Sequence, residues 1–99
     1  MLQYVMIKTW RHKGLKFFYD TGSKAKIQAS HADKIHDILQ ALDFATRPEH
    51  MDLPGLGFHK LSGNLKSFYS VIVNKNWRII FMFENQDAIL VDYLDYHKR

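Results

Sequence analysis

Residues 68–94, FYSVIVNKNWRIIFMFENQDAILVDYL, decide the fold of this chain. The stretch holds three short runs of β-branched and aromatic residues, a composition typical of strands, at 68–73, 77–83 and 88–94. The polar segments between these runs, 74–76 and 84–87, predict hairpin turns. Strands that follow one another through hairpins run antiparallel, so the stretch predicts an antiparallel sheet.

The register of these hairpins determines which side chains share a face of the sheet. The expected pairs are Phe83 opposite Ala88, which sets Arg78 opposite Tyr93, and Val73 opposite Trp77, which sets Arg78 opposite Ile72. Side chains alternate along a strand, so one face is predicted to lie under helices and to carry Trp77, Ile79, Phe81 and Phe83. The other face then carries Arg78, Ile80 and Met82, and its two apolar side chains suggest a contact with another protein. A slip of one residue would reverse these faces.

Two helices are predicted before this sheet. Residues 13–20 (KGLKFFYD) form the first, and Gly22 is suited to its C-terminal cap. Ser30 is the expected N-cap of the second, and Asp33 helps to satisfy the free N–H groups of its first turn. The apolar residues of this second helix recur at intervals of three and four, at Ile35, Ile38, Leu39 and Leu42.

Two further short strands are predicted, at 5–10 and near 58–61, and residues 46–57 predict a surface loop that contains both prolines. The expected fold class is α+β, with an N-terminal strand and two helices packed on one face of a twisted, mainly antiparallel sheet. The length of 99 residues fits a single domain that spans residues 1–99.

Composition and charge exclude several classes of protein. A hydrophobic share of 46% excludes intrinsic disorder, and no apolar run approaches the roughly 20 residues of a membrane span. The opening residues, MLQYVMIKTW, lack the pattern of a signal peptide. The absence of cysteine excludes disulfides, thiolate nucleophiles and cysteine-bound zinc, and fits a reducing cytoplasm. A net charge of +4 favours a polyanionic partner such as nucleic acid.

Arg78 is the only charged residue of the strand predicted at 77–83, and an arginine there needs an anionic partner or access to water. It is either a solvated or Asp95-paired residue at a strand end, or a group that binds phosphate. Asp95, Tyr96 and His97 form a compact acid, phenol and imidazole set that suits proton transfer. The alternative for this set is a passive C-terminal tail. If the chain leaves the sheet at the end of the last strand, the set comes to lie near Arg78.

Basic side chains gather in two other regions. One region holds His59, Lys60 and Lys66, and the other holds Lys8, Arg11, Lys13 and Lys16. Positive charge in these regions suits phosphate oxygens, although such charges are also common on ordinary solvated surfaces. No histidine spacing fits a metal site and no glycine-rich phosphate loop occurs, so neither a metal nor a cofactor is expected.

Several strings spread along the chain form a pattern. The second half contains LSGN at 61–64, YSVIVN at 69–74, NWRIIF at 76–81 and DYLDYH at 92–97. The first half contains IKTW at 7–10, KGL at 13–15 and LDFAT at 42–46. Together these strings resemble the HigB toxins of bacterial toxin–antitoxin systems, which belong to the RelE/ParE-like superfamily. The resemblance covers nearly the whole chain and implies a RelE-like fold, with residues 1–5 as an N-terminal extension.

The resemblance implies a small, ribosome-dependent mRNA endonuclease that inhibits translation and acts in the cytoplasm. Its implied partners are a cognate helix-turn-helix antitoxin of the HigA type, the bacterial 70S ribosome and mRNA, and no membrane. The residues that match the functional positions of the family are His59, Arg78, Asp95, Tyr96 and His97.

This resemblance gives each matching group a chemical role. RNA supplies its own nucleophile, the 2′-hydroxyl, so the protein has to position the strand, transfer protons and neutralise the phosphorane. Arg78 suits the charge of the non-bridging oxygens, whereas His97 and His59 suit proton transfer. Asp95 would orient His97 or the RNA, and Tyr96 would stack on a base. The basic cluster near the first helix would bind ribosomal RNA.

One departure and two alternatives accompany this interpretation. Ser62 stands where some family members carry a lysine, and Lys60 or Lys66 would then supply that charge. One alternative is a non-catalytic, ParE-like inhibitor of DNA gyrase on the same scaffold, although the terminal Asp-Tyr-His set favours an enzyme. The other alternative is a basic RNA-binding module whose C-terminus is passive.

Overall fold

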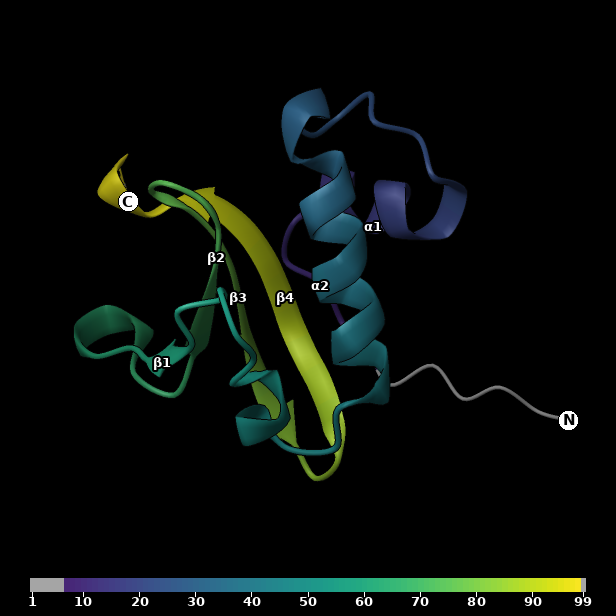
Figure 1. Cartoon of the computed structure of the whole chain (residues 1–99). Helices are drawn as coiled ribbons and strands as arrows, with labels where there is room; N and C mark the ends of the chain where they lie inside the picture. Colours follow the sequence, from purple (N-terminus) through teal and green to yellow (C-terminus); the bar gives the residue numbers. More distant parts are fainter. Residues whose placement is uncertain (1–6, 99) are drawn as a thin grey trace, which may run out of the picture.

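The computed structural model describes residues 7–98 and has the predicted α+β class (Figure 1). Its regular elements are α1 (Lys13–Thr21), α2 (Ala32–Phe44), β1 (His59–Lys60), β2 (Tyr69–Asn74), β3 (Trp77–Glu84) and β4 (Asp87–Asp95). Four short 3-10 turns accompany them: η1 (Ala29–His31), η2 (Pro48–Met51), η3 (Gly63–Leu65) and η4 (Tyr96–Lys98). The expected N-terminal extension, residues 1–5, lies outside the described residues, as does the beginning of the strand predicted at 5–10.

The four strands form one sheet in the order β1-β2-β3-β4, and each neighbouring pair is antiparallel. The N-terminal segment runs along the free edge of β4, where Ile7 pairs with Ala88 and Trp10 with Val91 in parallel bridges. Both helices lie on the same side of the sheet, with α2 running beside β4 in the view of Figure 1. The predicted layering of two helices on one face is therefore confirmed.

The register between β3 and β4 agrees with the prediction at one end of the hairpin only. Phe83 lies opposite Ala88, as expected. Arg78, however, lies opposite Leu94 and not opposite Tyr93. A bulge between these two pairs shifts the register by one residue. The sequence carries no glycine at this position to signal the bulge, so the shift could not be anticipated from pattern alone.

The register between β2 and β3 also contains an irregularity. Arg78 lies opposite Ile72, as predicted, but Trp77 pairs with Asn74 and not with Val73. The turn residue Lys75 takes a left-handed conformation with φ 53° and closes the tighter hairpin. The faces of β3 nevertheless keep their predicted identity. Its side chains Ile79 and Phe81 are buried under the helices, and Trp77 and Phe83 pack against the same core.

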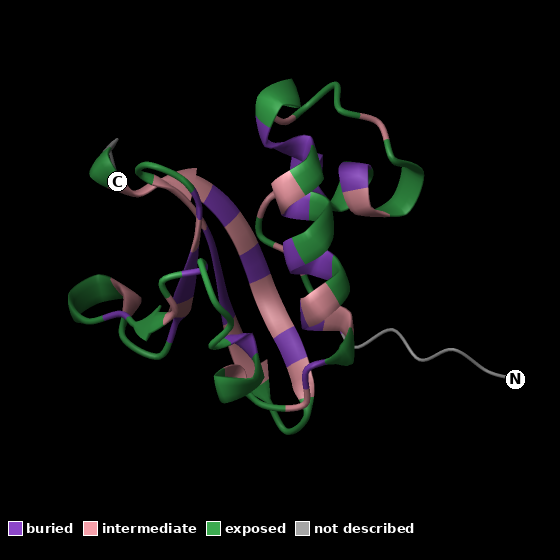
Figure 2. Ribbon diagram, in the orientation of Figure 1, coloured by how far each residue is buried: buried purple, intermediate pink, exposed green. Residues whose placement is uncertain are grey.

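The main core lies between the helices and the sheet. Along α2 the buried apolar side chains are those predicted from the spacing, at Ile35, Ile38, Leu39 and Leu42. Figure 2 shows burial alternating along β4, as a strand with one covered face requires. A smaller cluster of Leu61, Phe68 and Ile80 lies on the opposite face of the sheet. Ile80 is 0% exposed in this cluster, so the predicted contact of Ile80 with another protein is wrong.

The two helix starts differ from the sequence prediction. Ser30 is not the N-cap of α2, because residues 29–31 form the turn η1 and the helix follows from His31 without a side-chain cap. His31 is buried, and its Nδ1 lies 2.7 Å from the hydroxyl of Tyr93, so packing against the sheet determines where α2 begins. At α1, His12 acts as the N-cap, since its Nδ1 accepts the Leu15 N–H at 2.9 Å. Gly22 caps the end of α1 at φ 80°, as predicted.

A phenol–carboxylate contact joins α1 to α2. The Tyr19 hydroxyl donates to Asp43, whose two carboxylate oxygens lie 2.7 and 2.8 Å away. Burial and the hydrogen bond to Asp43 raise the pKa of Tyr19 well above its usual value of 10.0. Burial also raises the pKa of Asp43, and the hydrogen bond from Tyr19 opposes that rise. The folded state thus holds Tyr19 in its protonated form.

The Tyr19→Phe variant is expected to unfold about 1 kcal/mol more easily at neutral pH, since a half-exposed carboxylate loses its donor. A raised folded-state pKa contributes stability that is present below pH 10 and is lost as the pH rises further. The stability of Tyr19→Phe should therefore fall less steeply above pH 10 than that of the wild type. Urea unfolding over a pH series measures both effects.

Tyr69→Phe is a matched control, because the Tyr69 ring is stacked between Phe58 and Phe81. This variant should follow the wild-type pH dependence. If the stability of Tyr19→Phe also followed the wild-type pH dependence, the hydroxyl of Tyr19 would not be the group responsible for the loss of stability above pH 10.

No helix in the described range 7–98 is long and apolar enough to cross a membrane.

Candidate functional site

The side chain of Arg78 lies on the face of the sheet that the helices leave open. Arg78 points to the same side as Ile80, two residues further along β3, and Ile80 belongs to the smaller apolar cluster. The neighbours of that cluster include Leu94 of β4 and Tyr96 of η4. An apolar floor on a twisted sheet therefore surrounds a single half-buried guanidinium.

Two contacts hold the guanidinium of Arg78. Its Nη1 donates to Oγ of Ser70, a fully buried residue of β2, at 3.2 Å. Its central carbon lies 5.1 Å from the centre of the Tyr96 ring, in the range of a cation–π contact. Its Nε is buried and has no hydrogen-bond partner among the described residues. An unpaired buried donor costs about 1–3 kcal/mol, so stability alone does not account for this arginine.

The C-terminal turn η4 brings Tyr96 to Arg78. The Tyr96 N–H donates to the carbonyl of Asn76 at 2.8 Å, which ties the turn to the β2–β3 hairpin. The predicted proximity of Tyr96 to Arg78 is thus confirmed. His97 follows directly, with an exposed side chain on the same turn.

Asp95 does not pair with Arg78. It lies opposite Trp77 in the β3–β4 register, and neighbouring residues of a strand point to opposite faces. Its Oδ1 accepts the backbone N–H of His97 at 3.1 Å. The alternative of an Asp95–Arg78 ion pair is therefore wrong, and the carboxylate holds the backbone of the turn that carries His97.

His59 lies on the same face, two strands away from Arg78. On β1 it is paired with Ser70, and paired residues of antiparallel strands point to the same side. Its Nδ1 lies 3.1 Å from the carbonyl oxygen of Gly57. Because a carbonyl only accepts hydrogen bonds, Nδ1 must carry the proton, and Nε2 of the neutral ring is left with a lone pair.

The predicted basic residues divide between different surfaces. Lys60 is paired with Tyr69, so it points to the opposite side of the sheet from His59. Lys66 is exposed in the connection between η3 and β2. Lys16 forms an ion pair with Asp20 at 2.7 Å on α1. The other members of the N-terminal cluster, Lys8, Arg11 and Lys13, are exposed.

Sequence reasoning missed Ser70. A serine inside a β-branched strand carries no signal by itself, and only the register places it beside Arg78. The signal available in the sequence was the position of Ser70 in the alternation of 69–73, which puts it on the same face as the arginine once the hairpin register is known.

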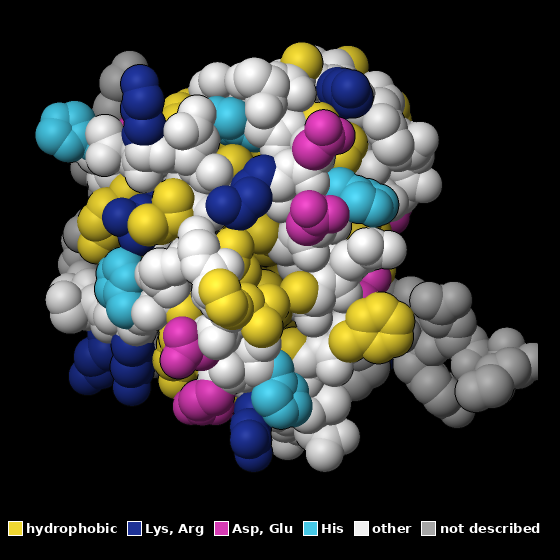
Figure 3. All heavy atoms as spheres, viewed as in Figure 1, with side chains coloured by type: hydrophobic (Ala, Val, Ile, Leu, Met, Phe, Trp, Pro, Cys, Tyr) yellow, Lys and Arg dark blue, Asp and Glu magenta, His cyan; other side chains and the backbone are white. Residues whose placement is uncertain are grey.

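Two hollows lie on the helical side of the sheet, away from this face. One, of about 490 Å³, lies between α1 and α2 beside Tyr19 and Asp43. The other, of about 230 Å³, lies between α2 and the loop around Leu53, where Figure 3 shows hydrophobic side chains at the surface. Within residues 7–98, no three histidine or carboxylate side chains come together as a metal site. Neither of these two hollows is lined by Arg78, Ser70 or Tyr96.

Comparison with known proteins shows the family of the chain. The family model described as "RelE-like toxin of type II toxin-antitoxin system HigB" matches residues 8–97. A protein of Proteus vulgaris named "Endoribonuclease HigB" is 40% identical over 92 residues, which cover 93% of this chain and 100% of the relative. A protein of Vibrio cholerae serotype O1 named "Toxin HigB-1" is 35% identical over 95 residues, covering 94% and 99%. The chain therefore belongs to the HigB-like family of RelE-like toxins of type II toxin–antitoxin systems.

Proposed function

We propose that this toxin is an endoribonuclease that cleaves translated mRNA on the ribosome at the Arg78 face. The observation that supports the proposal most is the guanidinium of Arg78, held by Ser70 and the ring of Tyr96 on an open face. The name of the Proteus vulgaris relative, an endoribonuclease, supports the same reaction. The alternative of a gyrase inhibitor is not favoured, since the two relatives are both HigB proteins.

The reaction proposed needs no protein nucleophile. The 2′-oxygen of a ribose attacks the adjacent phosphorus while the bond from phosphorus to the 5′-oxygen breaks. His59 accepts the proton of the 2′-hydroxyl through Nε2, and His97 donates a proton to the leaving 5′-oxygen. Arg78 neutralises the two non-bridging oxygens as negative charge develops on them. The products are a 2′,3′-cyclic phosphate and a 5′-hydroxyl.

Tyr96 and Asp95 have supporting roles in this proposal. Tyr96 holds the guanidinium of Arg78 through its ring and offers an aromatic surface to a base of the RNA. Asp95 keeps η4 folded by accepting the His97 N–H. A displaced η4 would move both Tyr96 and His97, so Asp95 acts as a positioning residue.

A type II toxin has an antitoxin as its partner, and we propose that this antitoxin is a HigA-like helix-turn-helix protein. The other partners proposed are mRNA and the ribosome, and the site of action is the cytoplasm. Exposed lysines on several surfaces suit phosphates of ribosomal RNA, namely Lys8, Lys13, Lys16, Lys60 and Lys66. Binding to the ribosome would hold the mRNA in the geometry of in-line attack, which accounts for a site as open as this one.

The test is cleavage of an mRNA on programmed ribosomes, with analysis of the new ends. We expect a 2′,3′-cyclic phosphate on one fragment and a 5′-hydroxyl on the other. An mRNA with a 2′-deoxyribose at the cleavage position is the matched control and should stay intact. Fragments with 5′-phosphate ends would exclude attack by the ribose hydroxyl, and intact transcripts together with trapped gyrase would favour the inhibitor.

A further inference from the structure

We propose that Arg11 binds a second phosphate of the mRNA, next to the phosphate that Arg78 neutralises. The two arginines would then hold neighbouring parts of one RNA strand across the open face. This inference rests on the proposed function of the Arg78 face. It assigns Arg11 to the mRNA, whereas the lysines of the N-terminal cluster are proposed to bind ribosomal RNA.

The backbone of Arg11 is tied to the edge of the sheet. Its N–H donates to the carbonyl of Val91 at 2.8 Å, directly after the bridge between Trp10 and Val91. Two residues earlier, Oγ1 of Thr9 accepts the N–H of Leu90 at 2.8 Å. Leu90 has a φ of 53°, and the bulge of β4 at this position turns its N–H outward to Thr9. The start of the Arg11 side chain is thus fixed relative to β4.

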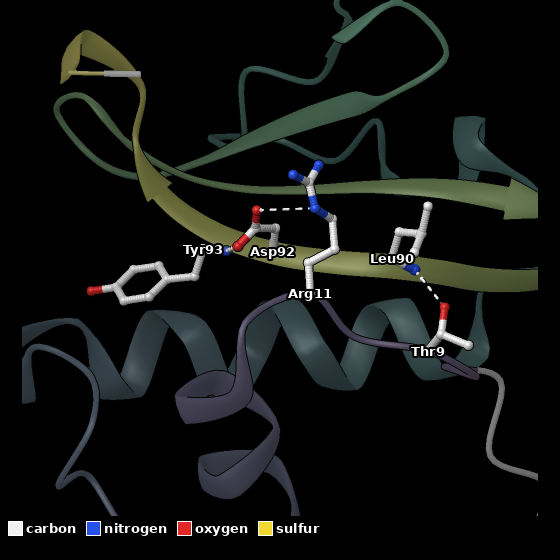
Figure 4. A network of polar contacts seen from close by, with 5 residues as sticks. All are labelled: Thr9, Arg11, Leu90, Asp92 and Tyr93. Atoms are coloured by element: carbon white, nitrogen blue, oxygen red, sulfur yellow. Dashed lines mark hydrogen bonds and ion pairs between the residues drawn. The ribbon is translucent and has the colours of Figure 1, made fainter.

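A carboxylate orients the side chain. Nε of Arg11 lies 3.8 Å from Oδ2 of Asp92, while Oδ1 of the same carboxylate accepts the Tyr93 N–H at 2.9 Å. Figure 4 shows the two terminal nitrogens of Arg11 pointing away from Asp92. Asp92 therefore engages one edge of the guanidinium, and the other edge is available for the paired hydrogen bonds that arginine makes with phosphate.

An aromatic ring supports the guanidinium from a second direction. The central carbon of Arg11 lies 5.5 Å from the centre of the Phe68 ring, and Phe68 is buried in the smaller apolar cluster. Arg78 has the same two kinds of support, one polar partner in Ser70 and one ring in Tyr96. Both guanidinium groups are thus held in place before any ligand binds, which reduces the entropy lost on binding.

The sheet register places the two arginines on one face. Ser70, Ile80 and Asp92 lie opposite one another on β2, β3 and β4, so their side chains point to the same side. Ser70 contacts Arg78 at one end of this row, and Asp92 contacts Arg11 at the other end. Ser70 and Ile80 are fully buried, so this row lies beneath the surface, and the two guanidinium groups flank it on the same face.

The Arg11–Asp92 contact is too exposed to serve mainly as a stabilising ion pair. The side chain of Arg11 is 47% exposed, and surface pairs of this kind contribute little to folding. Three separate contacts nevertheless converge on this residue, from the Val91 carbonyl, the Asp92 carboxylate and the Phe68 ring. An exposed cation held so firmly on the RNA face suits a ligand with a fixed negative charge.

The experiment compares wild type and Arg11→Ala on ribosomes programmed with mRNAs that carry one uncharged methylphosphonate near the cleavage position. We expect Arg11→Ala to raise KM for the unmodified mRNA about tenfold, with kcat changed by less than about twofold. One flanking methylphosphonate should weaken cleavage by the wild type and have no further effect on Arg11→Ala. Such non-additivity at a single phosphate identifies the contact.

Arg47→Ala is the matched control, because it removes an exposed arginine at the start of η2, outside the Arg78 face. It should keep the wild-type KM and the wild-type response to every methylphosphonate. Arg11→Gln keeps the stem of the side chain over Phe68 and replaces Arg11→Ala if thermal unfolding shows that the alanine variant is unstable.

The inference is overturned if the Arg11 variants respond to every methylphosphonate as the wild type does. A wild type that cleaves no mRNA on ribosomes would instead refute the proposed function, so the two failures are distinguishable. If KM rises equally in the Arg11 and Arg47 variants, net charge explains the effect, and Arg11 has no phosphate of its own.

Discussion

Replacing Arg78 by alanine is expected to lower single-turnover cleavage of mRNA on ribosomes by about 10²–10³-fold, the loss typical of removing one donor to a developing oxyanion. The fold should survive. Nε of Arg78 is buried without a partner among the described residues, and the side chain donates one hydrogen bond, to Ser70. Removing the side chain eliminates the cost of the unpaired Nε, but it also eliminates the hydrogen bond to Ser70 and the contact with the Tyr96 ring. Because these changes oppose one another, the free energy of unfolding should change by no more than about 1 kcal/mol.

Two companion variants show which property of Arg78 matters. Arg78→Lys keeps the charge but loses the planar fork and its stacking on Tyr96, and we expect a loss of about tenfold or more. Ser70→Ala keeps the arginine but removes the hydroxyl that orients it, and it should lower kcat by a smaller factor with little change in KM. Cleavage at the wild-type rate by a folded Arg78→Ala variant would refute the assignment of Arg78 to the phosphate.

Much of the fold was predictable because each element carries its own periodic signal. The spacing of Ile35, Ile38, Leu39 and Leu42 predicts the buried face of α2, and alternation predicts the covered face of β3. The start of α2 was not predictable in this way, because the buried contact between His31 and Tyr93 joins residues that are far apart in sequence. The shift that places Arg78 opposite Leu94 depends on Leu90, a residue type that rarely takes a positive φ.

The candidate site was predictable to the extent that strand ends determine it. A chain that leaves β4 after Asp95 must pass the start of β3, so the meeting of Tyr96 with Arg78 follows from the hairpin alone. The partners of these groups depend on which face each side chain takes. The one-residue shift therefore decided that Asp95 points away from Arg78, and register alone placed Ser70 beside it. Residues 1–5 lie outside the described range, and their role as an extension stays a prediction.

The largest pH-dependent effects are expected from His59 and His97. With Nδ1 of His59 facing the carbonyl of Gly57, the neutral ring presents Nε2 as a base, and this form is lost when the pH falls. His97 must be protonated to donate to the leaving oxygen, and this form is lost when the pH rises. The single-turnover rate of the wild type should therefore be bell-shaped in pH.

Each asparagine variant should lower the rate by about 10²–10⁴-fold and remove one limb of that profile. His59→Asn is expected to lose the acidic limb and His97→Asn the alkaline limb. His36→Asn is the matched control, since His36 is exposed on α2 on the opposite side of the sheet, and it should keep the full profile. Loss of the alkaline limb in His59→Asn would exchange the two roles. If both variants kept a bell-shaped pH–rate profile, neither histidine would transfer a proton in the reaction. A group that only binds RNA lowers the rate without removing a limb of the profile.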